Sequence, residues 1–262
     1  MNIIVCVKRV PETSEAEIAI DKSGKSIRTE DLVYDINEWD NYAVEEAVRI
    51  KETQGGTITV VTLGPQESQD TLRRSLAMGA DEALHLSDPA LFDGDPYATA
   101  RALHAALKEK PFDLLLTGVQ AGDDGYGQIG PILAEFFHVP HATMVSKLTI
   151  QDKKAQVHRE LEGGMEEVVL IELPAVLAIQ TGINEPRYVS IMGIRKAKSK
   201  ELREVSRNDI AFTPEEAGPA GSLTELKELF LPPTGKVAEI LKGSPDDVSV
   251  KVLEILREKG GL

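Results

Sequence analysis

The stretch that decides the fold is Gly118-Val-Gln-Ala-Gly-Asp-Asp-Gly-Tyr-Gly-Gln-Ile-Gly130. It follows an apolar run at 114–116 and leads into a helical pattern at 131–137. A strand, a glycine-rich turn and a helix, in this order, point backbone N–H groups at a phosphate. Five glycines in thirteen residues also allow close backbone approach and positive φ angles. The stretch has no lysine and matches neither a Walker loop nor a Gly-x-Gly-x-x-Gly fingerprint. It therefore predicts a nucleotide that is bound but not cleaved, with an ordinary strand-to-helix turn as the alternative.

The pattern around this stretch predicts an α/β domain. Apolar runs alternate with amphipathic segments, which indicates a parallel sheet with helices on both faces. We expect strands at 2–7, 57–63, 82–86 and 114–117, and helices at 41–52, 66–78, 96–109 and 131–137. Asp95 is the expected N-cap of the third helix. Ligands of such sheets bind beyond the carboxyl ends of the strands, where residues 6–10, 63–65 and the glycine-rich loop should meet.

Near residue 142 the pattern of alternating strands and helices gives way to consecutive strands. Residues 144–150 and 155–159 read as paired strands, and 167–173 and 175–180 continue in β fashion. Residues 211–221 read as a linker, 223–230 as a short helix and 248–259 as a final amphipathic helix. We therefore predict a Rossmann-like adenine-nucleotide-binding domain over residues 1–200, with an added β segment. An extended C-terminal arm over 201–262 is expected to pack on a partner subunit.

Composition excludes several classes of protein. The 262 residues carry a formal net charge of −14, which argues against nucleic acid as a partner. No apolar run approaches 18 residues, so we expect no membrane insertion. The single cysteine, Cys6, rules out an internal disulfide and fits the reducing cytoplasm, which is the expected location.

No catalytic set or metal site is evident in the sequence. The five histidines have no metal-ligand spacing, and Cys6 falls on an expected buried strand, where packing is its favoured role. Asp123 and Asp124 could bind a metal, hydrogen-bond a ribose or cap the next helix. We expect neither catalytic residues nor a metal.

Two further segments stand out. Tyr34-Asp-Ile-Asn-Glu-Trp-Asp40 holds the only tryptophan of the chain, directly before a helix. Its Asp40 is a natural N-cap, whereas Trp39 could offer a flat ring and Asn37 a hydrogen bond to a cofactor. Residues 182–198 set apolar side chains beside a basic run, which fits either a helix laid on the sheet or an interaction surface.

Together these segments resemble the beta (small) subunit of electron-transfer flavoprotein. The resemblance rests on Val5-Cys-Val-Lys-Arg-Val10, residues 43–52, Ala77-Met-Gly-Ala-Asp81, residues 157–169 with 174–178, and Asn184-Glu-Pro-Arg-Tyr188. It is strong over about residues 1–200 and loose in the tail. Tyr34–Asp40 and Gly118-Val-Gln120 are most similar to the subgroup that serves a bacterial trimethylamine dehydrogenase.

The resemblance implies an electron carrier rather than an enzyme. It implies a heterodimer with an alpha subunit that holds most of the redox FAD, while the beta subunit binds a structural AMP. Electrons would come from flavin-dependent dehydrogenases and pass to a quinone reductase or another acceptor. The nucleotide contacts carried over by position are Cys6, Asn37, Glu38, Trp39, Asp40, Leu63, Gly118, Gln120, Asp123, Asp124, Gly125, Tyr126, Gly127, Gln128 and Ile129.

The resemblance also assigns partner contacts. Trp39 becomes a neighbour of the FAD, and Glu160 aligns with an acid that pairs with an arginine of the large subunit. Ile191, with Met192 beside it, takes the place of the aliphatic anchor for partner dehydrogenases within the recognition segment 182–198.

Two questions stay open at the level of sequence. Gly127-Gln-Ile-Gly-Pro131 and Val10-Pro-Glu-Thr13 resemble the electron-bifurcating branch, in which a second FAD replaces AMP. Asn184-Glu-Pro and Glu162-Gly-Gly resemble the non-bifurcating branch, and we favour AMP. Outside this family, the alternatives are a nucleotide-binding regulatory protein of the universal-stress type and, less favoured, a small ATP-pyrophosphatase-like enzyme.

Overall fold

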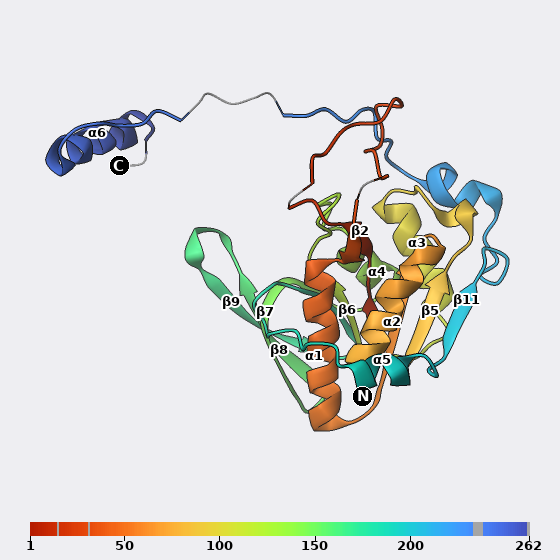
Figure 1. Ribbon diagram of the computed structural model, residues 1–262. Coiled ribbons are helices and arrows are strands. Elements are labelled where there is room, and N and C mark those ends of the chain that lie inside the picture. Colours follow the sequence, from red (N-terminus) through yellow and green to blue (C-terminus); the bar gives the residue numbers. More distant parts are fainter. Residues whose placement is uncertain (15, 31, 233–237, 261–262) are drawn as a thin grey trace.

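A nine-stranded sheet forms the centre of the protein. The computed structural model describes residues 1–14, 16–30, 32–232 and 238–260. Within them the strand order is β11-β5-β4-β1-β6-β10-β7-β8-β9. The first seven strands of this order are parallel, and the antiparallel β8 and β9 extend one end. Figure 1 shows this arrangement, with β8 and β9 reaching away from the main body.

The elements have the following bounds. The sheet contains β1 Asn2–Cys6, β4 Thr57–Leu63, β5 Glu82–Leu86, β6 Leu114–Gly118, β7 His141–Gln151, β8 Lys154–Glu160, β9 Glu166–Glu172, β10 Ala175–Ile179 and β11 Leu202–Val205. A separate two-stranded sheet pairs β2 Arg9–Pro11 with β3 Tyr34–Ile36. The helices are α1 Glu38–Gln54, α2 Gln69–Met78, α3 Pro96–Leu107, α4 Ile129–Phe137, α5 Ile191–Ala197 and α6 Pro245–Glu258.

Helices cover both faces of the sheet, as the alternating pattern predicts. Successive strand residues point to opposite faces, so Val5 packs with α1 and α2 whereas Ile4 packs with α3 and α4. Helix α5 lies beside α2 on the α1 face. Two cores therefore sandwich the sheet, and the predicted Rossmann-like fold class is confirmed.

The direction of the chain changes at β1. From β1 the chain crosses through α1 to β4 and then to β5, and it returns through α3 to β6 on the other side of β1. The loop after β1 leads to α1 on one face, and the loop after β6 leads to α4 on the opposite face. Such a switch point leaves a crevice between the carboxyl ends of the two strands, where ligands of open α/β sheets bind.

Most predicted elements are present, including Asp95 as N-cap of α3, where its carboxylate accepts the backbone N–H of Ala98 at 2.9 Å. Two predictions are wrong. Helix α1 begins at Glu38 rather than residue 41; of the readings that the sequence left open for Asp40, the N-cap is excluded, because Asn37 holds that position. Residues 223–230, expected to be helical, contain no helix.

The sheet also differs in extent from the prediction. Strand β10 belongs to the parallel sheet between β6 and β7, and not only to the added β segment. Strand β11 lies beyond residue 200 and forms the other edge of the sheet. The expected final helix is present as α6, none of whose residues is buried, and Figure 1 shows it apart from the sheet. Residues 233–237 and 261–262 of the predicted arm lie outside the described residues.

Candidate nucleotide site and docking segment

A cavity of about 520 Å³ lies at the switch point. Its walls come from the carboxyl ends of β1, β4 and β6, from the start of α1 and from the loop before α3. The lining includes twelve of the fifteen expected cofactor contacts: Cys6, Asn37, Asp40, Leu63, Gly118, Gln120, Asp123, Asp124, Tyr126, Gly127, Gln128 and Ile129. Glu38, Trp39 and Gly125 are not part of this lining. Whether a nucleotide occupies the cavity stays a prediction.

Asn37 and Asp40 fasten the glycine-rich loop to the first turn of α1. The Asn37 amide donates to the carbonyl of Gln120 at 2.8 Å and accepts the N–H of Gly122 at 3.1 Å. The buried carboxylate of Asp40 accepts the N–H groups of Lys8 at 2.7 Å and Gly118 at 2.9 Å. Asp40 therefore ties together the ends of β1 and β6, which explains why it does not cap its own helix.

Burial dominates the electrostatics of the inner wall. It raises the pKa of Asp40 to about 7, although the backbone N–H groups of Lys8 and Gly118 oppose the shift. Burial, with a smaller contribution from Asp40, also raises the pKa of the Cys6 thiol. A protonated thiol is a poor nucleophile, so Cys6 is a packing residue of the wall.

Lys8 joins the outer wall to the loop. Its ammonium group lies 2.7 Å from Asp123 Oδ1 and 2.7 Å from Asp124 Oδ2. Burial opposes the charge on Lys8, but the two carboxylates outweigh it and raise the pKa of Lys8. The acidic pair therefore holds a lysine, and among the described residues no cluster of His, Cys, Asp and Glu could hold a metal.

Two threonines of the wall have unpaired hydroxyl groups. Thr62 and Thr117 are buried and line the cavity, yet neither Oγ1 atom has a hydrogen-bond partner among the described residues. A buried hydroxyl without a partner is costly unless something else supplies the bond. The cavity therefore suits a polar ligand.

Sequence reasoning placed Lys8 at this edge, within the segment 6–10, but missed Thr62 and Thr117 of the lining. Each lies at the carboxyl end of a strand that borders the cavity, and that position was the signal that could have identified them. The wall from the loop before α3, including Phe92, has no comparable sequence signal.

The expected docking segment lies on α1 and α2. The guanidinium of Arg187 binds Glu45 and Glu52 of α1, with its Nε atom 2.8 Å from Glu45 Oε2. The Asn184 amide donates to Glu46 at 3.0 Å. These bonds hold the chain just before α5, whose first two residues, Ile191 and Met192, are 73% and 65% exposed.

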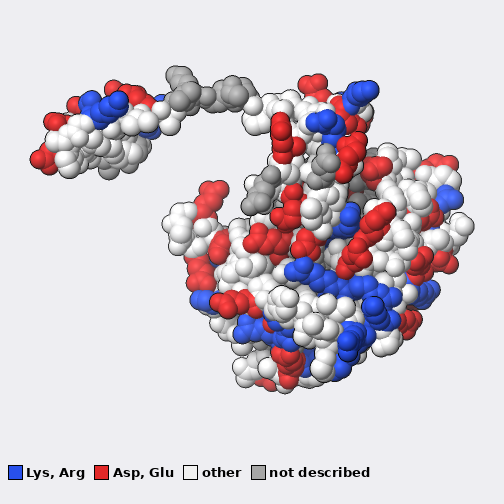
Figure 2. Space-filling model, in the orientation of Figure 1, with Lys and Arg blue, Asp and Glu red and all other residues white. Residues whose placement is uncertain are grey.

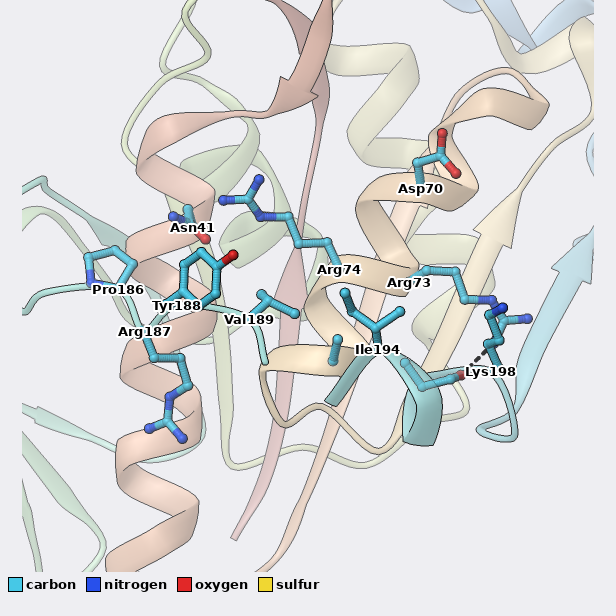
Figure 3. A pocket seen from close by; sticks show the side chains of 12 residues that line it. Asn41, Asp70, Arg73, Arg74, Pro186, Arg187, Tyr188, Val189, Ile194 and Lys198 are labelled. Carbon is cyan, nitrogen blue, oxygen red and sulfur yellow. Dashed lines mark hydrogen bonds between the residues drawn. The ribbon is translucent and has the colours of Figure 1, made fainter. Parts of the chain in front are cut away.

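A groove of about 790 Å³ runs between α2 and this segment. Figure 3 shows the residues around the groove, with Tyr188, Val189 and Ile194 from the docking segment and Arg73 and Arg74 from α2. Figure 2 shows basic side chains gathered across this face, although the chain as a whole is acidic. The segment therefore combines exposed apolar side chains with a basic rim.

Glu160 and Trp39 both form hydrogen bonds with the side chain of Gln180. Glu160 ends β8, and its Oε2 atom accepts a hydrogen bond of 3.2 Å from the Gln180 amide. The other end of that amide accepts the indole N–H of Trp39 at 2.9 Å. Gln180 directly follows β10 and had no predicted role, because that run was read as part of the added β segment.

The parallel sheet with helices on both faces, and the cavity at its switch point, define a Rossmann-like α/β protein. A family model described as "Electron transfer flavoprotein domain" matches residues 26–210. The chain is 36% identical over 265 residues to the "Electron transfer flavoprotein subunit beta" of Methylophilus methylotrophus, covering 100% of both chains. It is 39% identical to the protein of that name from Bacillus subtilis, covering 99% of this chain and 98% of the relative. The chain belongs to the electron transfer flavoprotein beta-subunit family.

Another full-length relative is named as a subunit of a reductase complex. The chain is 38% identical over 262 residues to the "Caffeyl-CoA reductase-Etf complex subunit CarD" of Acetobacterium woodii, covering 99% of both chains. Full-length similarity to this family displaces the universal-stress and ATP-pyrophosphatase alternatives. Among the described residues, no helix has the length and apolar character to span a membrane.

Proposed function

We propose that this chain is the small subunit of a heterodimeric electron carrier. Its alpha partner would hold most of the FAD, which accepts one or two electrons when bound. Flavin-dependent dehydrogenases would supply the electrons, and a quinone reductase or another acceptor in the cytoplasm or at a membrane would receive them. The beta subunit would contribute the nucleotide cavity, the docking segment and the C-terminal arm, without catalytic residues of its own.

We propose that the cavity binds the adenosine monophosphate group. The observation that supports this is the pair of buried, unpartnered hydroxyls of Thr62 and Thr117 in a cavity at the switch point. The start of α4 also lines the cavity, and its N-cap residue Gln128 makes no side-chain capping bond. Free N–H groups and the helix dipole at such a position favour a phosphate. The carboxylates of Asp123 and Asp124 would lie near the entrance, where Lys8 offsets one of their two charges.

Chromatography of the released ligands tests this assignment. The purified heterodimer is denatured, and the nucleotides in the supernatant are separated and counted against protein. One FAD and one AMP per heterodimer is the expected result. Two FAD and no AMP would replace the proposal with an electron-bifurcating subunit, and the absence of any nucleotide would remove the proposed cavity function.

The bifurcating alternative rests on two observations. The sequence Gly127-Gln-Ile-Gly-Pro131 resembles that branch, and the CarD relative covers the whole chain. The relatives named as ordinary beta subunits match equally well over their length. We favour AMP because Asn184-Glu-Pro and Glu162-Gly-Gly resemble the non-bifurcating branch.

We propose that residues 182–198 dock the dehydrogenase and that the arm 201–262 contacts the alpha subunit. Ile191 and Met192 are exposed apolar side chains on the same short helix as the basic Arg195 and Lys196, which is the composition of an anchor and its rim. Helix α6 exposes Val252, Leu253 and Leu256 and has a capping box at Ser244. An amphipathic helix with no buried residue fits a surface on another chain.

A further inference from the structure

Gln180 makes two side-chain hydrogen bonds that join distant parts of the chain. Its Oε1 atom accepts the indole N–H of Trp39 at 2.9 Å, and its Nε2 atom donates to Glu160 Oε2 at 3.2 Å. Trp39 lies in the first turn of α1, Glu160 at the end of β8 and Gln180 after β10. We refer to these two hydrogen bonds as the Gln180 bridge.

The orientation of the Gln180 amide follows from its neighbours. An indole N–H can only donate, and a backbone N–H can only donate as well. The N–H groups of Trp39 and Thr181 both point at Oε1, the latter at 2.9 Å. The opposite end must then be the NH₂ group, which meets the acceptor carboxylate of Glu160. A glutamate or leucine at position 180 could not serve both partners.

One end of the bridge lies against the glycine-rich loop, which lines the cavity at the switch point. The Cβ atom of Trp39 lies 2.6 Å from the place where a β-carbon on Gly118 would stand, and the Trp39 ring lies close to Gly122. The same loop is held by Asn37 and Asp40, and Val119 donates its N–H to Ile179, next to Gln180, at 3.0 Å. A change in the loop therefore reaches Trp39 and Gln180 directly.

The other end of the bridge is an exposed acid. Among the described residues Glu160 has no ion-pair partner, whereas its neighbours Arg159 and His158 contact Glu167 and Glu166 across the hairpin. The Gln180 amide is its only side-chain hydrogen bond in that part of the chain. An exposed glutamate ordinarily samples several rotamers, and a hydrogen bond from an amide limits that freedom.

We infer that Gln180 is a positioning residue that sets the Trp39 indole and the Glu160 carboxylate in one arrangement. The acid that we expect to meet the alpha subunit is thereby oriented from the rim of the nucleotide cavity. The part concerning Glu160 rests on the proposed function, and the part concerning Trp39 does not. An amide that donates and accepts at once is what this position requires.

The single tryptophan gives the first test. The heterodimer is produced with 5-fluorotryptophan, and the ¹⁹F resonance of Trp39 is assigned by its loss in Trp39→Phe. Gln180→Leu removes the acceptor and should shift or broaden this resonance. Gln180→Glu keeps an acceptor for the indole but faces the Glu160 carboxylate, so it is combined with Glu160→Gln, whose amide can donate to it. This double variant should bring the resonance back toward that of the native protein. Gln151→Leu, at an exposed residue of β7, is the matched control. An unchanged resonance in Gln180→Leu overturns the inference.

The second test concerns Glu160. The dissociation constant of the two subunits is measured for Glu160→Gln, Gln180→Leu and the double variant. If Gln180 acts through Glu160, both single variants weaken association by similar factors, and the double variant is no weaker than either. Additive factors would mean that Gln180 does not act through Glu160. If Glu160→Gln has no effect, the proposed pairing of Glu160 fails, while the ¹⁹F result still decides whether Gln180 positions Trp39.

Discussion

The carboxylate of Asp40 accepts the backbone N–H of Gly118 at 2.9 Å, and it occupies the space that a side chain on Gly118 would need. Gly118 therefore has to be glycine because of a neighbour from another part of the chain, and not because of its own backbone conformation. This contact fixes the first residue of the loop at the carboxyl end of β6. It connects α1 to the wall of the cavity at the switch point.

Replacing Gly118 with alanine should disrupt the cavity. The new β-carbon would lie 2.6 Å from Trp39 Cβ and closer still to Asp40 Oδ1, so α1 or the loop must move. We expect a loss of about 1–3 kcal/mol in the free energy of unfolding and less bound nucleotide. Gly122→Ala is the control, because its β-carbon would be 3.9 Å from its nearest neighbours. Equal nucleotide content in the two variants, measured by chromatography, would contradict this account of the loop.

Asp40 should also make stability depend on pH. Its pKa rises from 3.8 to about 7 in the folded chain because of burial, so the folded state binds more protons than the unfolded state between these values. The free energy of unfolding therefore falls as pH rises from about 4 to 7, by up to about 4 kcal/mol for this group, and is constant above.

Asp40→Asn removes the titrating group and isolates this effect. The difference in unfolding free energy between the variant and the native protein should change steadily from pH 4 to pH 7 and not beyond. Urea unfolding of the heterodimer at several pH values measures it. A difference that is independent of pH would show that Asp40 has an ordinary pKa in the folded chain.

The fold and most of the cavity could be predicted from sequence for a physical reason. Apolar runs that alternate with amphipathic segments indicate a sheet buried on both faces. The carboxyl ends of its strands are where ligands bind, so Cys6, Leu63 and Gly118 were expected at that edge, and all three line the cavity there. The role of Asp40 stayed open between an N-cap and a site residue, because local spacing cannot reveal a bond to Gly118, 78 residues away. Gln180 was missed because its run was read as part of the added β segment, and because spacing does not show that its partners come from α1 and β8.

The Arg187–Glu45 pair should hold the docking segment against α1. The side chain of Glu45 is 5% exposed and that of Arg187 is 33% exposed, so removing the guanidinium leaves a buried carboxylate that keeps only the backbone N–H of residue 187. Arg187→Met should lower the free energy of unfolding by about 2 kcal/mol, less than for a fully buried pair because water reaches the arginine. The double variant Arg187→Met/Glu45→Met should recover most of that loss. Urea unfolding measures both, and no recovery would mean that the pair acts through something other than its charges.

Ile191 should carry much of the affinity for the electron donor. It is 73% exposed at the first position of α5, held out by Ser190, whose hydroxyl accepts the N–H of Gly193 at 3.0 Å. An apolar side chain that becomes fully buried at an interface typically contributes about 2 kcal/mol, which is roughly thirty-fold in affinity. Ile191→Ala should therefore slow reduction of the heterodimer by a purified flavin-dependent dehydrogenase, such as trimethylamine dehydrogenase, at low protein concentration. Val33→Ala, at an equally exposed aliphatic residue, should leave the rate unchanged. If reduction by dithionite is normal in both variants and Ile191→Ala reacts with the dehydrogenase at the native rate, Ile191 is not the anchor.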